Sequence, residues 1–319
     1  MESRGILNLL DLQKKIDEVV DEVETVIIGK RDIIKLALTA VISDGHILIE
    51  DVPGVGKTML AKTLARALGC SFKRIQFTPD LLPADVTGVS IFNQKTSEFE
   101  FRPGPIFAQV VLADEINRST PKTQSSLLEC MEEKQVTVDG ATYQLPVPFV
   151  VIATQNDVEY HGTHPLPEAQ LDRFMMKLSI GYPREDEEYH ILHTHTTGRP
   201  IENVRCLLSP EQLLTLRSSL SGIHVDSDLH RYIVTLTSTT RSHPMLSLGV
   251  SPRGSLHLAR ASRAFALISG RNYVLPDDIK TLGVPVLAHR LVLSPEGQMG
   301  NLSPTDVVRE ILSSTPVPC

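Results

Sequence analysis

Residues 50–60 (EDVPGVGKTML) form the first segment whose residue types and spacing could do chemistry. Gly54 and Gly56 can adopt positive φ angles, which allows successive backbone N–H groups to point at a bound anion. Lys57 supplies a mobile positive charge for the outer phosphates of a nucleotide, and Thr58 supplies a hydroxyl for Mg²⁺. The segment therefore predicts a phosphate-binding loop. Its expected nucleotide-binding residues are Pro53, Gly54, Val55, Gly56, Lys57, Thr58 and Met59.

The surroundings of this loop agree with the motif, although one position departs from it. An apolar strand pattern (HILIE, 46–50) precedes the loop, and a helical pattern (59–68) follows it, so the helix dipole adds to phosphate binding. The strict pattern has a glycine five residues before Gly56, where this chain has Asp51. Asp tolerates unusual φ angles better than most residues, so the departure weakens the prediction little. The alternative is a structural turn that binds no phosphate.

Polar side chains also follow two later apolar strand patterns. The segment QVVLADEINR has four apolar residues at 110–113 and then Asp114 and Glu115. Asp114 fits a residue that holds Mg²⁺ through water, together with Thr58, and Glu115 fits a base that polarises the attacking water. Asn156 follows the next strand, where its amide could orient a water or contact a γ-phosphate. Each could instead be an ordinary polar residue at a strand end, but together with the loop they predict nucleotide hydrolysis.

Short apolar runs alternate with helical patterns through the first part of the chain, after two helical patterns at 8–26 and 29–43. Apolar strands that alternate with helices predict an α/β fold, with a five-stranded parallel sheet sandwiched by helices. After the charged segment 182–190 only helical patterns occur, and Ser251 is expected to cap one of these helices. We therefore expect a nucleotide-binding domain at 1–183 and a small all-helical lid domain at 184–319. The expected strands are 46–50, 72–77, 108–113, 148–154 and 174–180.

Composition narrows the class of protein. The chain has 319 residues and a formal net charge of −7, which disfavours a general duplex-DNA binder, because such proteins neutralise phosphates. Its four cysteines are scattered without a C-x-x-C pair, which argues against a zinc site or a disulfide framework. No apolar run is long enough to cross a bilayer, and no signal peptide is seen at the N-terminus. These features predict a cytoplasmic protein without a membrane span.

Taken together, these motifs resemble the AAA+ ATPases and, more narrowly, the MoxR family. The resemblance rests on the strings EDVPGVGKT, DEINRSTPKTQSSLLECMEE, ATQND and LPEAQLDRF, followed by SPRG in the helical part. In this family the first position of the loop varies, which accounts for Asp51. The resemblance implies ATP as the nucleotide and Mg²⁺ as the metal. It implies that the Walker A, Walker B and sensor 1 residues are Lys57, Thr58, Asp114, Glu115 and Asn156.

The resemblance also implies roles for residues outside the loop. Arg173, in LDRF, matches the arginine finger that reaches the nucleotide of a neighbouring subunit and stabilises transition-state charge. Arg253, in SPRG, matches sensor 2, which brings the lid onto the γ-phosphate. Gly29, in VIIGK, matches the segment that packs against the adenine, and Arg118 is an accessory candidate. The alternatives are a salt bridge at a helix end for Arg173 and a solvated side chain for Arg253.

Two segments between the expected strands have the pattern of hairpins. Segment 88–107 corresponds in the resembling proteins to the helix-2 insert. Segment 134–146 has Asp139 and Gly140 at its centre and corresponds to the pre-sensor-1 hairpin. In a ring, both would face the pore or a partner.

The favoured hypothesis is an Mg²⁺-dependent ATPase that remodels or matures protein complexes. An arginine finger that acts on a neighbour needs a ring, which in this family implies a hexamer. The resemblance further implies von Willebrand factor A-domain proteins as partners, with a protein client. A nucleic-acid motor is the first alternative, and the acidic balance counts against it. A nucleotide-gated binding module with little turnover is the second, and Glu115 counts against it.

Overall fold

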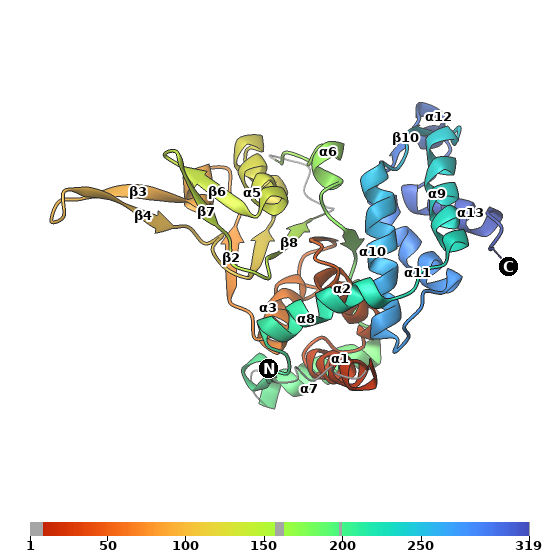
Figure 1. The fold of residues 1–319 in the computed structure, drawn as a ribbon, viewed down its shortest axis with the longest axis horizontal. Helices are drawn as coiled ribbons and strands as arrows, with labels where there is room; N and C mark the ends of the chain where they lie inside the picture. The colour runs from red at the N-terminus through yellow and green to blue at the C-terminus, as the bar shows by residue number, and fades with distance from the viewer. Residues whose placement is uncertain (1–8, 157–162, 198–199, 319) are drawn as a thin grey trace, which may run out of the picture.

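A five-stranded parallel sheet organises the first half of the chain (Figure 1). The computed structural model describes residues 9–156, 163–197 and 200–318. The strand order is β2–β5–β8–β1–β9, and each neighbouring pair is parallel. The predicted α/β fold is therefore confirmed. The five strands are β1 (Ile47–Glu50), β2 (Phe72–Gln76), β5 (Val110–Asp114), β8 (Val150–Gln155) and β9 (Met176–Leu178).

Alternate residues of the central strands face two separate hydrophobic cores. In β1, Ile47 and Ile49 belong to the core that α1, α2 and α3 share, whereas Leu48 belongs to the core that includes residues of α4 and α5. Both faces of the sheet are covered, which explains why its strands are apolar at nearly every position. The helices of the first face are α1 (Leu9–Glu24), α2 (Arg31–Ile42) and α3 (Lys57–Ala67), and those of the second are α4 (Pro83–Thr87) and α5 (Pro121–Glu133).

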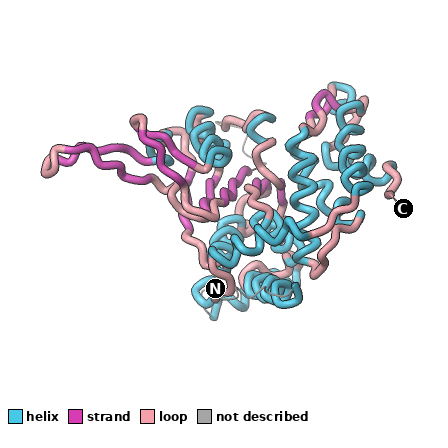
Figure 2. Tube along the Cα trace, in the orientation of Figure 1, coloured by secondary structure: helices cyan, strands magenta, loops and turns pink. Residues whose placement is uncertain are grey.

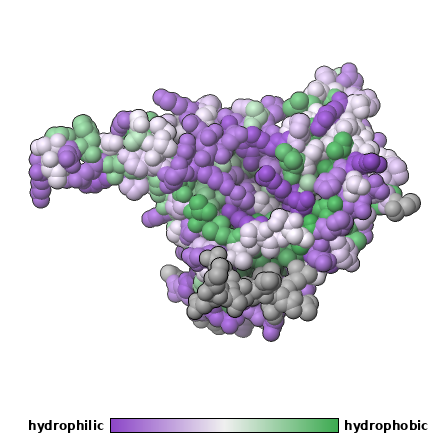
Figure 3. Space-filling view, in the orientation of Figure 1, coloured by the Kyte–Doolittle hydropathy of each residue, from purple (hydrophilic) through white to green (hydrophobic). Residues whose placement is uncertain are grey.

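Two antiparallel hairpins extend from this α/β body. The hairpin of β3 (Gly88–Asn93) and β4 (Glu98–Pro103) projects as a long arm (Figures 1 and 2). Hydrophobic and hydrophilic residues both lie on the surface of the arm (Figure 3), and Phe92 and Phe99 are 52% and 74% exposed. The second hairpin consists of β6 (Gln135–Val138) and β7 (Ala141–Gln144). Its turn, residues 139–140, has positive φ at both positions, as type I′ turns require.

The C-terminal half consists mainly of helices (Figure 2). It also holds a short antiparallel pair, β10 (Leu246–Leu248) and β11 (Val292–Leu293), so the expectation of helices alone was wrong in this detail. Strands of two or three residues are too short to leave an alternating pattern in the sequence. The remaining helices are α6 (Glu168–Leu171), α7 (Glu185–Thr197), α8 (Pro210–Ser219), α9 (Ser227–Ser242), α10 (Pro252–Ile268), α11 (Pro276–Leu287), α12 (Pro295–Met299) and α13 (Pro304–Ser314).

Helix α10 joins the helical half to the α/β body. It packs against α2 and α1 as well as against α9 and α11, and its buried residues belong to the same core as those of α2. The first turn of α10, which carries Arg253, therefore has a defined position relative to the sheet. None of the helices in the described ranges combines the length and the apolar character that a membrane span requires.

Candidate active site

The phosphate-binding loop lies between the end of β1 and the first residue of α3. Gly54 and Gly56 have φ angles of 90° and 96°, which only glycine adopts without strain. A Cβ atom at either position would meet no described atom within 4 Å. The backbone conformation, rather than crowding, therefore requires glycine at these two positions. Pro53 lies on the exposed side of the same loop.

The Lys57 side chain joins the loop to the end of β8. Its ammonium group donates to the Asp51 carbonyl at 2.7 Å, to the Gln155 carbonyl at 2.9 Å and to Asn156 Oδ1 at 2.6 Å. The side chain is buried, with the residue 7% exposed. Lys57 and Asn156, which lie 99 positions apart in the sequence, are thus brought into direct contact.

The last residue of β5, Asp114, and the residue after it, Glu115, both form hydrogen bonds with one buried hydroxyl. Thr154, in β8, donates to Asp114 Oδ1 at 2.6 Å, and its Oγ1 accepts the Glu115 N–H at 2.8 Å. The Thr58 hydroxyl lies 3.5 Å from Asp114 Oδ2. Glu115 has a φ of 56°, an uncommon value for a non-glycine residue. Thr154 was not predicted, because a threonine within an apolar strand pattern has no distinguishing signal.

The Glu115 carboxylate is held by three neighbouring side chains. Asn156 Nδ2 donates to Oε1 at 2.9 Å, Gln76 Nε2 donates to Oε2 at 2.8 Å, and the Arg118 guanidinium lies 3.3 Å from Oε2. The structure therefore brings Glu115 and Asn156 together, as the sequence suggested, and also places Arg118 beside them. Gln76 is an addition that the sequence analysis missed.

A cation from β2 binds the same carboxylate that Thr58 approaches. Arg74 contacts Asp114 Oδ2 through Nε at 2.8 Å and through Nη2 at 2.6 Å, and Nη2 also donates to Gln76 Oε1 at 2.6 Å. Arg74 and Gln76 are two positions apart on one strand, so they lie on the same face of the sheet. That spacing, at the carboxyl end of a strand, is the sequence signal that could have identified both residues.

Asp51, which departs from the glycine of the standard loop, has a definite structural role. Its Oδ2 accepts from the Ser179 hydroxyl at 2.9 Å and from the N–H groups of Ile180 and Gly181 at 2.7 Å each, and its Oδ1 accepts the Val52 N–H at 2.8 Å. Burial alone would raise the pKa of Asp51, but these hydrogen bonds outweigh it and hold the pKa below its ordinary value. Asp51 thus ties the loop to the chain that follows β9.

We expect the substitution Asp51→Asn to destabilise the fold at neutral pH by about 1–3 kcal/mol, because an amide NH₂ would face backbone donors. Because the folded-state pKa is lowered, the stabilisation is complete above the ordinary Asp pKa of about 4 and is lost as the pH falls through the folded-state value. Denaturant unfolding should show a difference in the free energy of unfolding between wild type and Asp51→Asn that decreases below about pH 4. Asp186→Asn, at an exposed position near this segment, is the matched control. Equal stability of Asp51→Asn and wild type at pH 7 would contradict this role.

An apolar cavity of about 200 Å³ lies beside the phosphate-binding loop. Val55 and Met59, both predicted to bind nucleotide, line this cavity together with Ile27 and Ile28. Gly29 does not line it. A Cβ atom on Gly29 would lie 2.0 Å from Glu187 Oε1, and its φ is 71°, so glycine there permits the close approach of α7. The cavity has the position and the apolar lining that an adenine ring requires.

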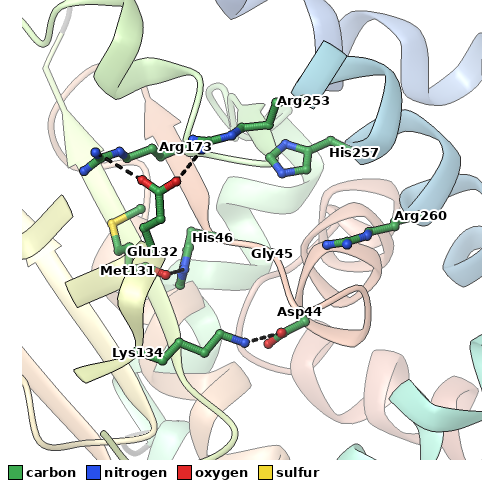
Figure 4. A pocket seen from close by; sticks show the side chains of 10 residues that line it. All are labelled: Asp44, Gly45, His46, Met131, Glu132, Lys134, Arg173, Arg253, His257 and Arg260. Carbon is green, nitrogen blue, oxygen red and sulfur yellow. Dashed lines mark hydrogen bonds and ion pairs between the residues drawn. The ribbon is translucent and has the colours of Figure 1, made fainter. Parts of the chain in front are cut away.

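Arg173 and Arg253 lie near the amino ends of the parallel strands, whereas the phosphate-binding loop lies at their carboxyl ends. Arg173 precedes β9, whose Met176 pairs with Ile47 at the start of β1, whereas the phosphate-binding loop follows the end of β1. Both arginines line a second cavity, of about 220 Å³ (Figure 4). The structure therefore brings Arg173 and Arg253 to each other and not to Lys57. Arg253, which was expected to bring the lid onto the γ-phosphate, thus lies away from the phosphate-binding loop of its own chain.

The backbone around Arg173 is anchored by residues that the sequence analysis missed. Arg290, which is 4% exposed, donates from Nε to Asp172 Oδ1 at 2.9 Å and from Nη2 to the Phe174 carbonyl at 2.6 Å. Burial lowers the pKa of Arg290 to about 10, so it stays charged at neutral pH. Ser251 stands at the N-cap position of α10, but its hydroxyl donates to the Asp172 carboxylate at 3.0 Å instead of capping the helix. The helical half thus fixes both neighbours of Arg173.

Two histidines line the second cavity without contributing charge at neutral pH. Burial lowers the pKa of His46 to about 4, and burial with the nearby Arg290 lowers the pKa of His257 to about 3. The positive charge of this cavity therefore comes from its arginines and its lysine.

Comparison with known proteins agrees with the fold. Residues 46–176 match the ATPase family associated with various cellular activities (AAA), and residues 238–311 match the AAA lid domain. The chain is 40% identical to Chaperone MoxR1 of Mycobacterium tuberculosis, over 95% of this chain and 82% of that protein. It is 53% identical to YeaC of Bacillus subtilis, an uncharacterized protein, over 97% of this chain and 96% of that one. A crystal structure of a candidate ATPase from Cytophaga hutchinsonii superposes with a TM-score of 0.91 at 40% identity, over 98% of this chain and 97% of that chain.

The fold, the site and the family match define an AAA ATPase with a nucleotide-binding core and a helical lid. Within that class, the chain belongs to the MoxR family.

Proposed function

We propose that this ATPase hydrolyses ATP with Mg²⁺ in a hexameric ring, and that Arg173 of one protomer completes the site of the next. The observation that carries this proposal is the separation within one chain. The loop and the two acids lie at the carboxyl ends of the strands, and Arg173 and Arg253 lie near the amino ends. Adjacent protomers in a ring can bring these opposite ends of the sheet together. Arg253 then acts on the neighbour together with Arg173, as the cavity that they share suggests.

The proposed roles follow from the contacts at the loop edge. Lys57 and the backbone of the loop bind the β- and γ-phosphates, and Glu115 is the base that polarises the attacking water. Asn156 connects the two, because its amide contacts both the Lys57 ammonium and the Glu115 carboxylate. Asn156 can therefore change the orientation of the Glu115 carboxylate when a phosphate group binds to Lys57.

The side chains near the loop fit a magnesium ion. Thr58 and Asp114 offer a hydroxyl and a carboxylate oxygen 3.5 Å apart, and Mg²⁺ prefers oxygen ligands, with water completing its shell. A bound Mg²⁺ would neutralise charge on the β- and γ-phosphates. Arg74 lies on the same Asp114 oxygen, so it would have to share or leave this position.

We further propose that the work of the ring is to remodel or mature protein complexes in the cytoplasm, with von Willebrand factor A-domain proteins as partners. The name of the relative Chaperone MoxR1 supports a chaperone-like role. The exposed arm of β3 and β4 gives a ring a surface for the pore or for a partner. In this scheme residues 1–183 form the nucleotide-binding domain and 184–319 the lid.

The proposal predicts that ATPase activity and assembly depend on each other. The ATPase rate per protomer should rise steeply with protein concentration, and sedimentation should show a ring with ATP and Mg²⁺ that dissociates when Mg²⁺ is chelated. A rate per protomer that is constant over a hundredfold dilution, with a monomer in every condition, would contradict the shared site. Strong stimulation by single- or double-stranded DNA would instead favour a nucleic-acid motor.

A further inference from the structure

One carboxylate contacts both arginines of the second cavity. Glu132, in the last turn of α5, accepts Arg173 Nη2 on Oε2 at 3.1 Å and Arg253 Nη2 on Oε1 (Figure 4). The two guanidinium groups therefore converge within the width of a single carboxylate. Arginine binds carboxylate and phosphate oxygens with the same forked geometry.

The backbone positions of the two arginines do not depend on Glu132. Asp172, beside Arg173, is held by Arg290 and by Ser251, and Ser251 is also the N-cap residue of the helix that carries Arg253. Glu132 therefore engages only the guanidinium ends of side chains whose backbone other contacts already fix.

The ion pairs that Glu132 makes are open to exchange. The side chains of Glu132, Arg173 and Arg253 are 39%, 29% and 38% exposed, and ion pairs at such exposure stabilise a fold weakly. A competing anion can thus replace the carboxylate at small cost.

The second cavity also has more positive than negative charge. Its other acid, Asp44, is already shared by Lys134 and Arg217. Arg260 lines the cavity as well, and within the described ranges its guanidinium makes no hydrogen bond or ion pair. The charge that remains favours an additional anion.

We propose that Glu132 is a substitute anion, which holds Arg173 and Arg253 together and yields them to the terminal phosphate of a nucleotide bound by the neighbouring protomer. This inference rests on the proposed ring with shared sites. In it Glu132 competes with assembly for the two arginines, and the arginines themselves contact the nucleotide. Glu132 thereby raises the protein concentration at which shared sites form and limits hydrolysis by protomers that meet only briefly.

The test is the ATPase rate of Glu132→Gln as a function of protein concentration, with sedimentation of the same samples in ATP and Mg²⁺. Removing the competing charge should lower the concentration for half-maximal rate by about 3- to 10-fold, as expected for two exposed ion pairs. The rate at saturating concentration should stay within about twofold of wild type, because the arginines remain. Glu133→Gln removes the same charge one residue away; in the described part of the chain, Glu133 contacts neither arginine, so this control should behave as wild type. Glu132→Ala should shift the concentration in the same direction, which guards against an effect peculiar to glutamine.

The outcomes separate this inference from the proposed function. If wild type depends on concentration but Glu132→Gln matches Glu133→Gln, the substitute-anion role is overturned and the ring is not. A Glu132→Gln variant that needs a higher concentration, or that loses rate at saturation as Arg173→Ala does, would show that Glu132 positions the arginines for catalysis and would also overturn the inference. A wild-type rate independent of concentration would overturn the ring and this inference together.

Discussion

Replacing Glu115 by glutamine is expected to lower the ATP turnover rate by about 10²- to 10⁴-fold, the usual contribution of a general base. Glutamine keeps the size of the side chain, and its one carbonyl oxygen can still accept from either Asn156 or Gln76, but not from both. It cannot accept a proton from the attacking water at neutral pH. ATP binding should survive, because the Lys57 ammonium is held by the Asp51 and Gln155 carbonyls and by Asn156, and this change leaves all three groups in place.

Two measurements on the same preparation separate binding from chemistry. Equilibrium titration with a fluorescent ATP analogue should give a dissociation constant within about threefold of wild type, because the contacts that bind ATP in the ground state are retained. Single-turnover hydrolysis by the same variant should be nearly abolished. Glu129→Gln, an exposed acid on α5, controls for the loss of one negative charge. Turnover close to wild type in Glu115→Gln would refute the assignment of Glu115 as the base. Loss of ATP binding would instead show that Glu115 supports the loop.

The parts of this molecule that could be predicted from sequence are those with a local pattern. The strands of the sheet are apolar at nearly every position because both faces are covered, so their order along the chain was visible. Lys57, Asp114 and Asn156 each follow or end a strand, and the carboxyl ends of parallel strands meet at one edge. Their juxtaposition therefore followed from the fold, and the contact between Lys57 and Asn156 agrees with it.

The residues that escaped prediction depend on contacts between distant segments. Arg290 and Asp172 lie 118 positions apart, and neither has a motif that marks it as a partner of the other. Asp51 could be seen as a departure from the loop pattern, but its bonds to residues 179–181 require the position of β9. The placement of Arg253 depends on how α10 packs against α2, which side-chain periodicity does not encode. The chemistry of the local motifs could thus be predicted from the sequence, whereas the position of the lid relative to the sheet could not.

Replacing Arg173 by alanine is expected to lower the hydrolysis rate by about 10³-fold or more, the usual effect of losing an arginine finger. The guanidinium is replaced by a methyl group, so no cation is left at this position to stabilise charge on the transferred phosphoryl group. Nucleotide binding by the same chain should persist, because Arg173 lies near the amino ends of the strands and the loop lies at their carboxyl ends. In the proposed ring, the lost interaction belongs to the site of the neighbour.

Two inactive proteins should restore each other when they are mixed, which tests the shared site more sharply than the single variant does. Arg173→Ala keeps an intact Glu115, and Glu115→Gln keeps an intact Arg173. When they are mixed one to one before ATP is added, about half of the sites keep Glu115 and about half of those face an intact Arg173, so about a quarter of the wild-type rate should return. The matched control mixes Arg173→Ala with a double variant that carries both changes, from which no protomer can donate the arginine. Mixtures that stay as inactive as their components would show that Arg173 acts within its own chain or on no nucleotide at all, because an arginine shared between neighbours must be able to complement.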